Sequence, residues 1–97
     1  MKAINEIKRI IEAHKEELEI KYGVKQIGLF GSFVRYEQKE TSDVDILVEF
    51  ERPIGLLKFV GLQNYLSDML EVKVDLVMKR ALRPRIGESI LKEVVYV

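Results

Sequence analysis

The stretch that decides the fold is GLFGSFVRYEQKETSDVDILVEF, residues 28–50. It begins with an apolar segment that runs into Gly31 and Ser32, and it ends with Asp43 and Asp45 inside an otherwise apolar run. A carboxylate at the edge of a protein core costs several kcal/mol unless water, a cation or hydrogen bonds compensate it. Two carboxylates on one face of a strand therefore indicate an open site.

Residues 43–50 alternate between two faces, as a half-buried strand does. The apolar face carries Val44, Ile46, Val48 and Phe50. The other face carries Asp43, Asp45, Leu47 and Glu49. We therefore expect only one face of the sheet to be deeply buried.

The chain before this strand predicts a helix, a strand and a short second helix. Residues 2–21 predict one helix that ends at Gly23, and its apolar stripe consists of Ile4, Ile7, Ile11 and Leu18. Residues 24–30 predict a short strand, and the Gly-Ser pair can begin a brief helix over residues 31–37. A polar loop follows.

The chain after this strand predicts two more helices and a further strand. Residues 56–70 are apolar on more than half of the helix circumference and predict a well-buried helix. Residues 72–78 alternate again, with Asp75 on the side opposite the apolar set. A last helix is expected at about residues 86–93, after Pro84, with an extended end. The expected fold is α/β (α+β), a small mixed sheet with helices packed on its apolar face.

Asp43, Asp45 and Asp75 all lie on the faces opposite the apolar sets of their strands. Residues two apart on a strand are separated by about 6.5 Å and neighbouring strands by about 4.8 Å, so neighbouring strands would bring the three carboxylates together. Three such anions resist joint ionisation unless a cation sits among them. Oxygen ligands suit Mg²⁺ or Mn²⁺, and a pair of these ions about 4 Å apart commonly serves displacement at phosphorus.

Each aspartate also has an ordinary structural explanation. Asp43 can cap a turn after Ser42, Asp45 can be solvated, and Asp75 can pair with Lys73 or an arginine. The three together favour the site.

The Gly-Ser pair supplies the second half of a phosphate site. Gly31 permits a sharp turn and close approach of a ligand, and Ser32 adds a hydroxyl donor beside free backbone amides. A serine here is also a routine helix cap. The sequence contains neither a Walker A lysine loop nor a G-x-G-x-x-G motif, which excludes the common nucleotide-binding folds.

Composition narrows the class of protein. The 97 residues include 16 basic and 16 acidic side chains and no cysteine, so there is no net field for nucleic acid or an anionic membrane and no thiol chemistry. No apolar stretch is long enough to span a bilayer. We expect one domain over residues 1–97, in a soluble cytoplasmic protein that binds neither nucleic acid nor membrane.

Gly31-Ser32, ten intervening residues, Asp43-Val44-Asp45 and then Asp75 resemble the polymerase-β-type nucleotidyltransferase superfamily. More narrowly, the short chain resembles a minimal nucleotidyltransferase (MNT), the antitoxin-like partner of HEPN-domain proteins in toxin–antitoxin pairs. The resemblance covers most of the chain, from the first helix to residue 97.

The resemblance implies a role for each matched position. Gly31 and Ser32 match the triphosphate-binding corner, Arg35 a position that is often basic, and Tyr36 a position that is usually glycine. The three aspartates match the catalytic and metal-binding carboxylates: Asp43, Asp45 and Asp75. The implied reaction transfers AMP or another NMP from an NTP, with ATP as the expected substrate, to a hydroxyl of a HEPN-type partner, using two Mg²⁺ ions.

A competing interpretation is an antitoxin that binds nucleotide without catalysis and neutralises its partner by contact. The apolar helix 56–70, or Phe33 and Tyr36, is also expected to contribute to a homo-oligomer or a partner interface. Arg80, Arg83 and Arg85 can grip phosphates or an acidic partner, or can form surface ion pairs. His14 is expected to be structural.

Overall fold

The computed structural model describes residues 2–97, which form one four-stranded mixed sheet in the order β3-β2-β1-β4. The strands are β1 (Val24–Phe30), β2 (Val44–Phe50), β3 (Val74–Met78) and β4 (Val95–Tyr96). β1 runs antiparallel to β2 and β4, whereas β2 and β3 are parallel. The expected α/β fold is confirmed.

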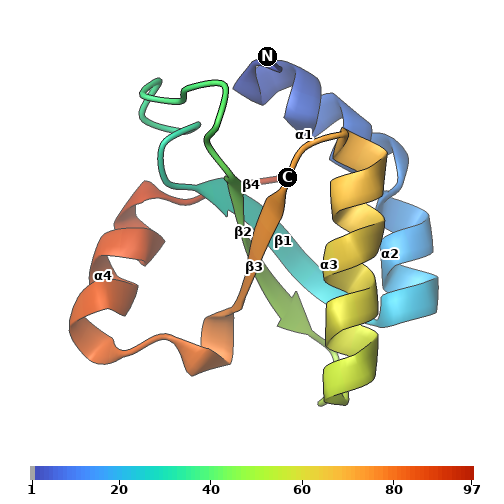
Figure 1. Cartoon of the computed structure of the whole chain (residues 1–97). Helices are drawn as coiled ribbons and strands as arrows, with labels where there is room; N and C mark the ends of the chain where they lie inside the picture. Colours follow the sequence, from blue (N-terminus) through green and yellow to red (C-terminus); the bar gives the residue numbers. More distant parts are fainter. Residues whose placement is uncertain (1) are drawn as a thin grey trace.

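The helices lie on both sides of this sheet, so the expectation that they pack only on its apolar face is wrong (Figure 1). They are α1 (Ile4–Ala13), α2 (Lys15–Tyr22), α3 (Leu56–Leu70), the 3₁₀ helix η1 (Lys79–Ala81) and α4 (Pro84–Glu93). Figure 1 shows α1, α2 and α3 on one side of the sheet and α4 on the other. Among residues 2–97, no helix has both the length and the apolar character needed to cross a membrane.

The core lies between the sheet and the first three helices. The predicted stripe of Ile4, Ile7, Ile11 and Leu18 is buried there, at 0 to 7% exposure. It packs with the predicted apolar face of β2, where Val44, Ile46 and Val48 are also buried. The period-2 and period-3.6 patterns are therefore confirmed where they decide the core.

The prediction of a single helix over residues 2–21 is wrong, because the helix is interrupted at His14. This residue has φ −110° and ψ 9°, its amide donates to the Ile11 carbonyl, and its Nδ1 lies 2.8 Å from the Ile10 carbonyl oxygen. The break reorients the chain, and Leu18 and Tyr22 of α2 are both buried. α2 ends at Gly23 in the left-handed conformation, as predicted.

The brief helix expected over residues 31–37 is also wrong, because this segment forms hydrogen-bonded turns. The amides of Val34 and Arg35 donate to the Gly31 carbonyl, which gives a single helical turn. Gly31 and Tyr36 have φ values of 80° and 59°, so left-handed residues interrupt the helix at both ends. Tyr36 thus adopts the left-handed conformation that favours glycine.

Burial departs from expectation at two places. Leu62, Leu66 and Leu70 bury the second half of α3, but Leu56 and Leu57 in its first turn are 76% and 91% exposed, so α3 is not buried throughout. On the opposite face of the sheet Leu47 is only 1% exposed, so that face is not open along its whole length.

The association surface named from the sequence is also only partly available. Phe33 is 2% exposed and part of the core, which removes it from that surface, whereas Tyr36 is 79% exposed.

Two boundaries also move. β3 begins at Val74 rather than at residue 72. α4 begins at Pro84, which is its first helical residue. The extended end expected after the last helix is confirmed as β4, which pairs with β1.

Replacing Tyr36 with glycine should stabilise the fold. A non-glycine residue in the left-handed region costs about 1–2 kcal/mol, and glycine returns part of this gain through the entropy of the unfolded chain. Because the Tyr36 side chain is mostly exposed, little burial is lost. We expect Tyr36→Gly to raise the free energy of unfolding by about 0.5 kcal/mol in urea titrations. Glu40→Gly, at an exposed loop residue without a positive φ, should lower it.

Candidate active site

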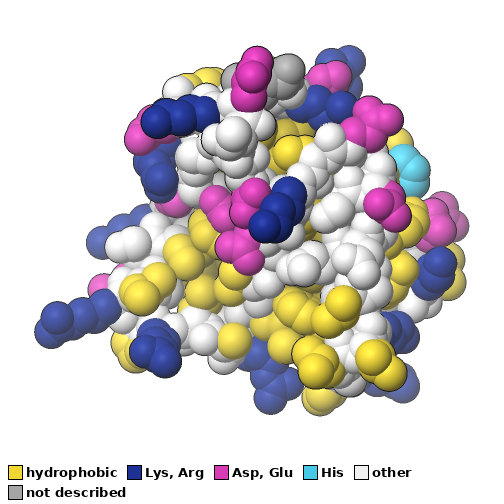
Figure 2. All heavy atoms as spheres, viewed as in Figure 1, with side chains coloured by type: hydrophobic (Ala, Val, Ile, Leu, Met, Phe, Trp, Pro, Cys, Tyr) yellow, Lys and Arg dark blue, Asp and Glu magenta, His cyan; other side chains and the backbone are white. Residues whose placement is uncertain are grey.

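The pairing of β2 with β3 places two of the predicted site residues side by side. Asp45 and Asp75 are partners in the parallel ladder, and Asp43 stands just before β2, where the Val44 amide donates to the Lys73 carbonyl at 2.9 Å. Figure 2 shows acidic side chains gathered over the middle of the sheet, between α3 and α4. The two strands are therefore neighbours, as the convergence of the carboxylates requires.

The three carboxylates share one electrostatic environment. Partial burial, followed by the charges of Asp75 and Asp43, raises the pKa of Asp45 to about 6. The Arg35 guanidinium acts in the opposite direction and lowers the pKa of the same carboxyl. Asp45 is thus the centre of an acidic cluster with one cation at its side, an arrangement that a bound metal ion would relieve.

Gly31 joins the Gly-Ser corner to the acidic cluster. A Cβ atom at residue 31 would collide with Oδ2 of Asp45, so only a glycine lets the backbone come this close to the carboxylate. Phe33 anchors the same turn in the core. The predicted phosphate corner and the predicted metal ligands therefore lie against each other.

One residue of this corner was not predicted. Glu93, at the end of α4, accepts a hydrogen bond from the Gly31 amide at 2.9 Å and one from Nη1 of Arg35 at 2.6 Å. Arg35 also donates from Nε to Glu37 at 3.1 Å. Glu93 and Gly31 are 62 residues apart, and no spacing or motif in the sequence marks Glu93 as a site residue.

The carboxylates of Asp43, Asp45 and Asp75 suit a hard cation in their chemistry, but their arrangement does not form a metal site. Carboxylate oxygens are the ligands that Mg²⁺ and Mn²⁺ prefer. Within the described part of the chain, however, no three His, Cys, Asp or Glu side chains are arranged to hold a metal ion. The predicted roles of Asp43, Asp45 and Asp75 as metal ligands therefore remain a hypothesis.

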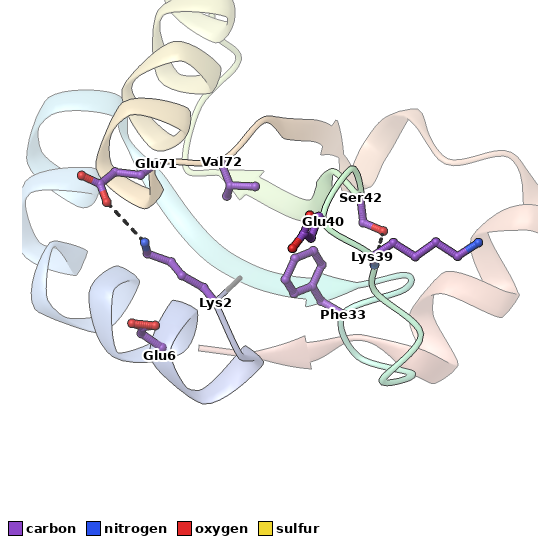
Figure 3. A pocket seen from close by; sticks show the side chains of 8 residues that line it. All are labelled: Lys2, Glu6, Phe33, Lys39, Glu40, Ser42, Glu71 and Val72. Carbon is purple, nitrogen blue, oxygen red and sulfur yellow. Dashed lines mark hydrogen bonds and ion pairs between the residues drawn. The ribbon is translucent and has the colours of Figure 1, made fainter.

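A pocket of about 570 Å³ lies beside the segment that connects Ser32 to Asp43 (Figure 3). It is lined by Lys2, Glu6, Phe33, Lys39, Glu40, Ser42, Glu71 and Val72. Lys2 pairs with Glu71 across it at 3.4 Å, and the Lys39 amide donates to Oγ of Ser42 at 2.8 Å. None of the three aspartates lines this pocket. Two of its lining residues are sequence neighbours of the predicted site, because Phe33 directly follows Ser32 and Ser42 directly precedes Asp43.

The remaining predicted residues lie outside the acidic cluster. Arg80 belongs to η1, and Arg83 and Arg85 flank the start of α4. None of the three forms an ion pair with another residue in the range 2–97. His14 is half-buried at the junction of α1 and α2, which agrees with a structural role.

Comparison with known proteins places the chain. A family model described as "Nucleotidyltransferase domain" matches residues 7–97. The chain is 54% identical over 97 residues to the protein adenylyltransferase MntA of Thermococcus cleftensis, which covers 100% of this chain and 98% of that protein. It is 51% identical over 98 residues to a Methanocaldococcus jannaschii protein named as a candidate protein adenylyltransferase, with 100% of both chains covered.

Solved structures agree with this placement. A candidate minimal nucleotidyltransferase, 35% identical, superposes with a TM-score of 0.81 over 97% of this chain and 95% of that one. A toxin–antitoxin structure with AMP-PNP, 23% identical, shares the fold with a TM-score of 0.74 over 93% of this chain and 70% of that chain. The resemblance to minimal nucleotidyltransferases is thereby confirmed, and the chain belongs to the nucleotidyltransferase domain family.

Proposed function

We propose that residues 1–97 form one nucleotidyltransferase domain that transfers AMP from ATP to a hydroxyl group of a HEPN-domain protein. The observation that carries this proposal is the contact of the Gly31 backbone with Asp45, because it joins a phosphate corner to a carboxylate cluster. The similarity over the whole chain to a protein adenylyltransferase supports the donor and the reaction. The fold shared with a complex of a tri-AMPylated Shewanella oneidensis HEPN toxin and its MNT antitoxin suggests the partner.

The proposed reaction is a displacement at the α-phosphorus of ATP. The oxygen of a tyrosine, serine or threonine hydroxyl forms a bond to this phosphorus, and the bond from the phosphorus to the bridging oxygen of pyrophosphate breaks. The products are the AMP ester, pyrophosphate and the proton of the hydroxyl. A docked protein supplies the orientation that this small domain, whose net charge is zero, does not provide for a free acceptor.

The chain's own residues divide the work in this proposal. Asp43, Asp45 and Asp75 would hold two Mg²⁺ or Mn²⁺ ions, which neutralise phosphate charge and favour ionisation of the attacking hydroxyl when bound. Asp75 is exposed and can accept the proton of that hydroxyl. Ser32 and Arg35 hold the leaving phosphates as their negative charge develops, and Gly31, whose amide donates to Glu93, lets them come close to the backbone.

A binding role without catalysis is the second candidate. It is favoured by one observation, namely that no three acidic, histidine or cysteine side chains in residues 2–97 are arranged for a metal ion. In that case the domain binds nucleotide and neutralises its partner by contact alone. The two candidates differ in whether the partner is covalently changed.

The first prediction is therefore covalent modification of the partner. The protein is incubated with Mg²⁺, ATP and a HEPN-domain protein from the same organism, and the intact mass of this partner is measured. We expect the partner to gain the mass of one or more AMP groups, and the gain to disappear with Asp75→Asn. Glu49→Gln, on the same face of β2, is the matched control and should retain transfer. A partner that is inhibited yet unmodified would support the binding role instead.

The second prediction concerns the stability of the metal-free protein. The pKa of Asp45 is about 6 in the folded protein, against an ordinary value of 3.8 that applies to the unfolded chain. As the pH rises, this carboxyl therefore ionises in the unfolded chain first. Stability is therefore lost between about pH 4 and pH 6 and stays lower above that range. With EDTA at pH 7, Asp45→Asn should be more stable than the wild type by about 1 kcal/mol, after allowance for solvent screening. The gap should narrow toward pH 4.

Adding Mg²⁺ to the same samples tests the metal assignment. Ligands that bind only the folded state stabilise it, so Mg²⁺ with ATP should raise the melting temperature of the wild type. Asp45→Asn should show no such rise and should lose AMP transfer while it remains folded. Equal Mg²⁺ responses of the two proteins would contradict the role of Asp45, and unfolding of the variant would assign it a structural one.

A further inference from the structure

We propose that Glu93 is a positioning residue of the nucleotide site, which holds the Gly31 turn and the Arg35 guanidinium in the orientation that receives the triphosphate. The inference rests on the proposed function, because that function assigns phosphate binding to the turn that begins at Gly31 and to Arg35.

The geometry of Glu93 supports this role directly. Its two carboxylate oxygens have separate partners: Oε2 accepts from the Gly31 amide at 2.9 Å, and Oε1 accepts from Nη1 of Arg35 at 2.6 Å. One rigid, planar group therefore fixes a backbone donor and a side-chain donor relative to each other. The Glu93 side chain is only 21% exposed, so water competes weakly for these bonds.

The backbone of Glu93 is held just as firmly. Two residues later the chain enters β4, where Val95 pairs with Leu29 and Tyr96 with Gly28 of β1. The Val97 amide then donates to the Ile27 carbonyl at 2.9 Å. β1 itself ends next to Gly31, so the strand that anchors Glu93 is the strand that delivers the phosphate corner. A positioning residue needs such a rigid support.

The position of Glu93 in α4 is electrostatically unfavourable for a carboxylate unless other groups compensate its charge. Glu93 lies at the C-terminal end of α4, where the helix dipole disfavours negative charge. The hydrogen bonds from Gly31 and Arg35 compensate the placement of Glu93.

The hydrogen bonds of Glu93 predict what happens when its charge is removed. Without it, the Gly31 amide and the Arg35 guanidinium lose the carboxylate that joins them, and neither keeps its orientation toward the phosphates. Glu37 cannot take over, because it contacts only Nε of Arg35, is 63% exposed and has no bond to Gly31. Glu93 and Glu37 therefore form a matched pair for an experiment, since both bind the same guanidinium.

The experiment compares Glu93→Gln, Glu37→Gln and the wild type in two measurements. Equilibrium binding of ATP with Mg²⁺ is measured by calorimetry, and KM and kcat for AMP transfer are measured with the HEPN-domain partner. We expect Glu93→Gln to weaken ATP binding and raise KM by about tenfold, with a smaller change in kcat at saturating ATP. Glu37→Gln should change binding by less than about twofold.

Thermal melts establish that each variant is folded, and Glu93→Asp, which keeps the charge on a shorter side chain, replaces Glu93→Gln if the latter unfolds. A folded Glu93→Gln protein with unchanged ATP affinity would overturn the inference while leaving the proposed function intact. Tighter ATP binding would also overturn it, since Glu93 would then compete with the phosphates. A wild-type protein that binds no ATP would overturn the proposed function and this inference with it.

Discussion

The parallel pairing of β2 with β3 is the constraint on which the rest of the structure depends. A parallel pair cannot be closed by a tight turn and needs a long crossover, which α3 provides. Because α3 packs its buried half on one face of the sheet, that face becomes the core and the opposite face is left to Asp45 and Asp75. The same pairing therefore decides where the apolar side chains go and which charges face each other.

Much of this arrangement follows from short-range patterns. The alternation in residues 43–50 places Val44, Ile46 and Val48 on the core face, and the structure confirms this, although Leu47 on the opposite face is buried as well. Residues 24–30 and Gly23 behave as their sequence predicts, since strand propensity and a left-handed cap are local properties. The resemblance to nucleotidyltransferases adds the expectation that three aspartates and a Gly-Ser corner belong together.

What could not be predicted depends on contacts between distant residues. The break at His14 is set by the surface on which α2 packs, and helical periodicity alone does not register it. The exposed first turn of α3 is at least as apolar as its buried end, so composition cannot identify which end is buried. Glu93 reaches the site only because β4 pairs with β1, and a glutamate at the end of an amphipathic helix is otherwise unremarkable in sequence. Sequence patterns thus assign side chains to the faces of strands and helices, whereas tertiary pairing determines which distant residues come into contact.

The β4–β1 pairing also determines when the site can exist during synthesis. Its parts come from four separated places: residues 31–35, residues 43–45, Asp75 and Glu93. A nascent chain folds progressively from its N-terminus, so the phosphate corner and the first two aspartates emerge from the ribosome long before Glu93. The corner is completed only after α4 has formed and β4 has paired with β1. The proposed nucleotide site is therefore complete only in the finished domain and not in any growing fragment of it.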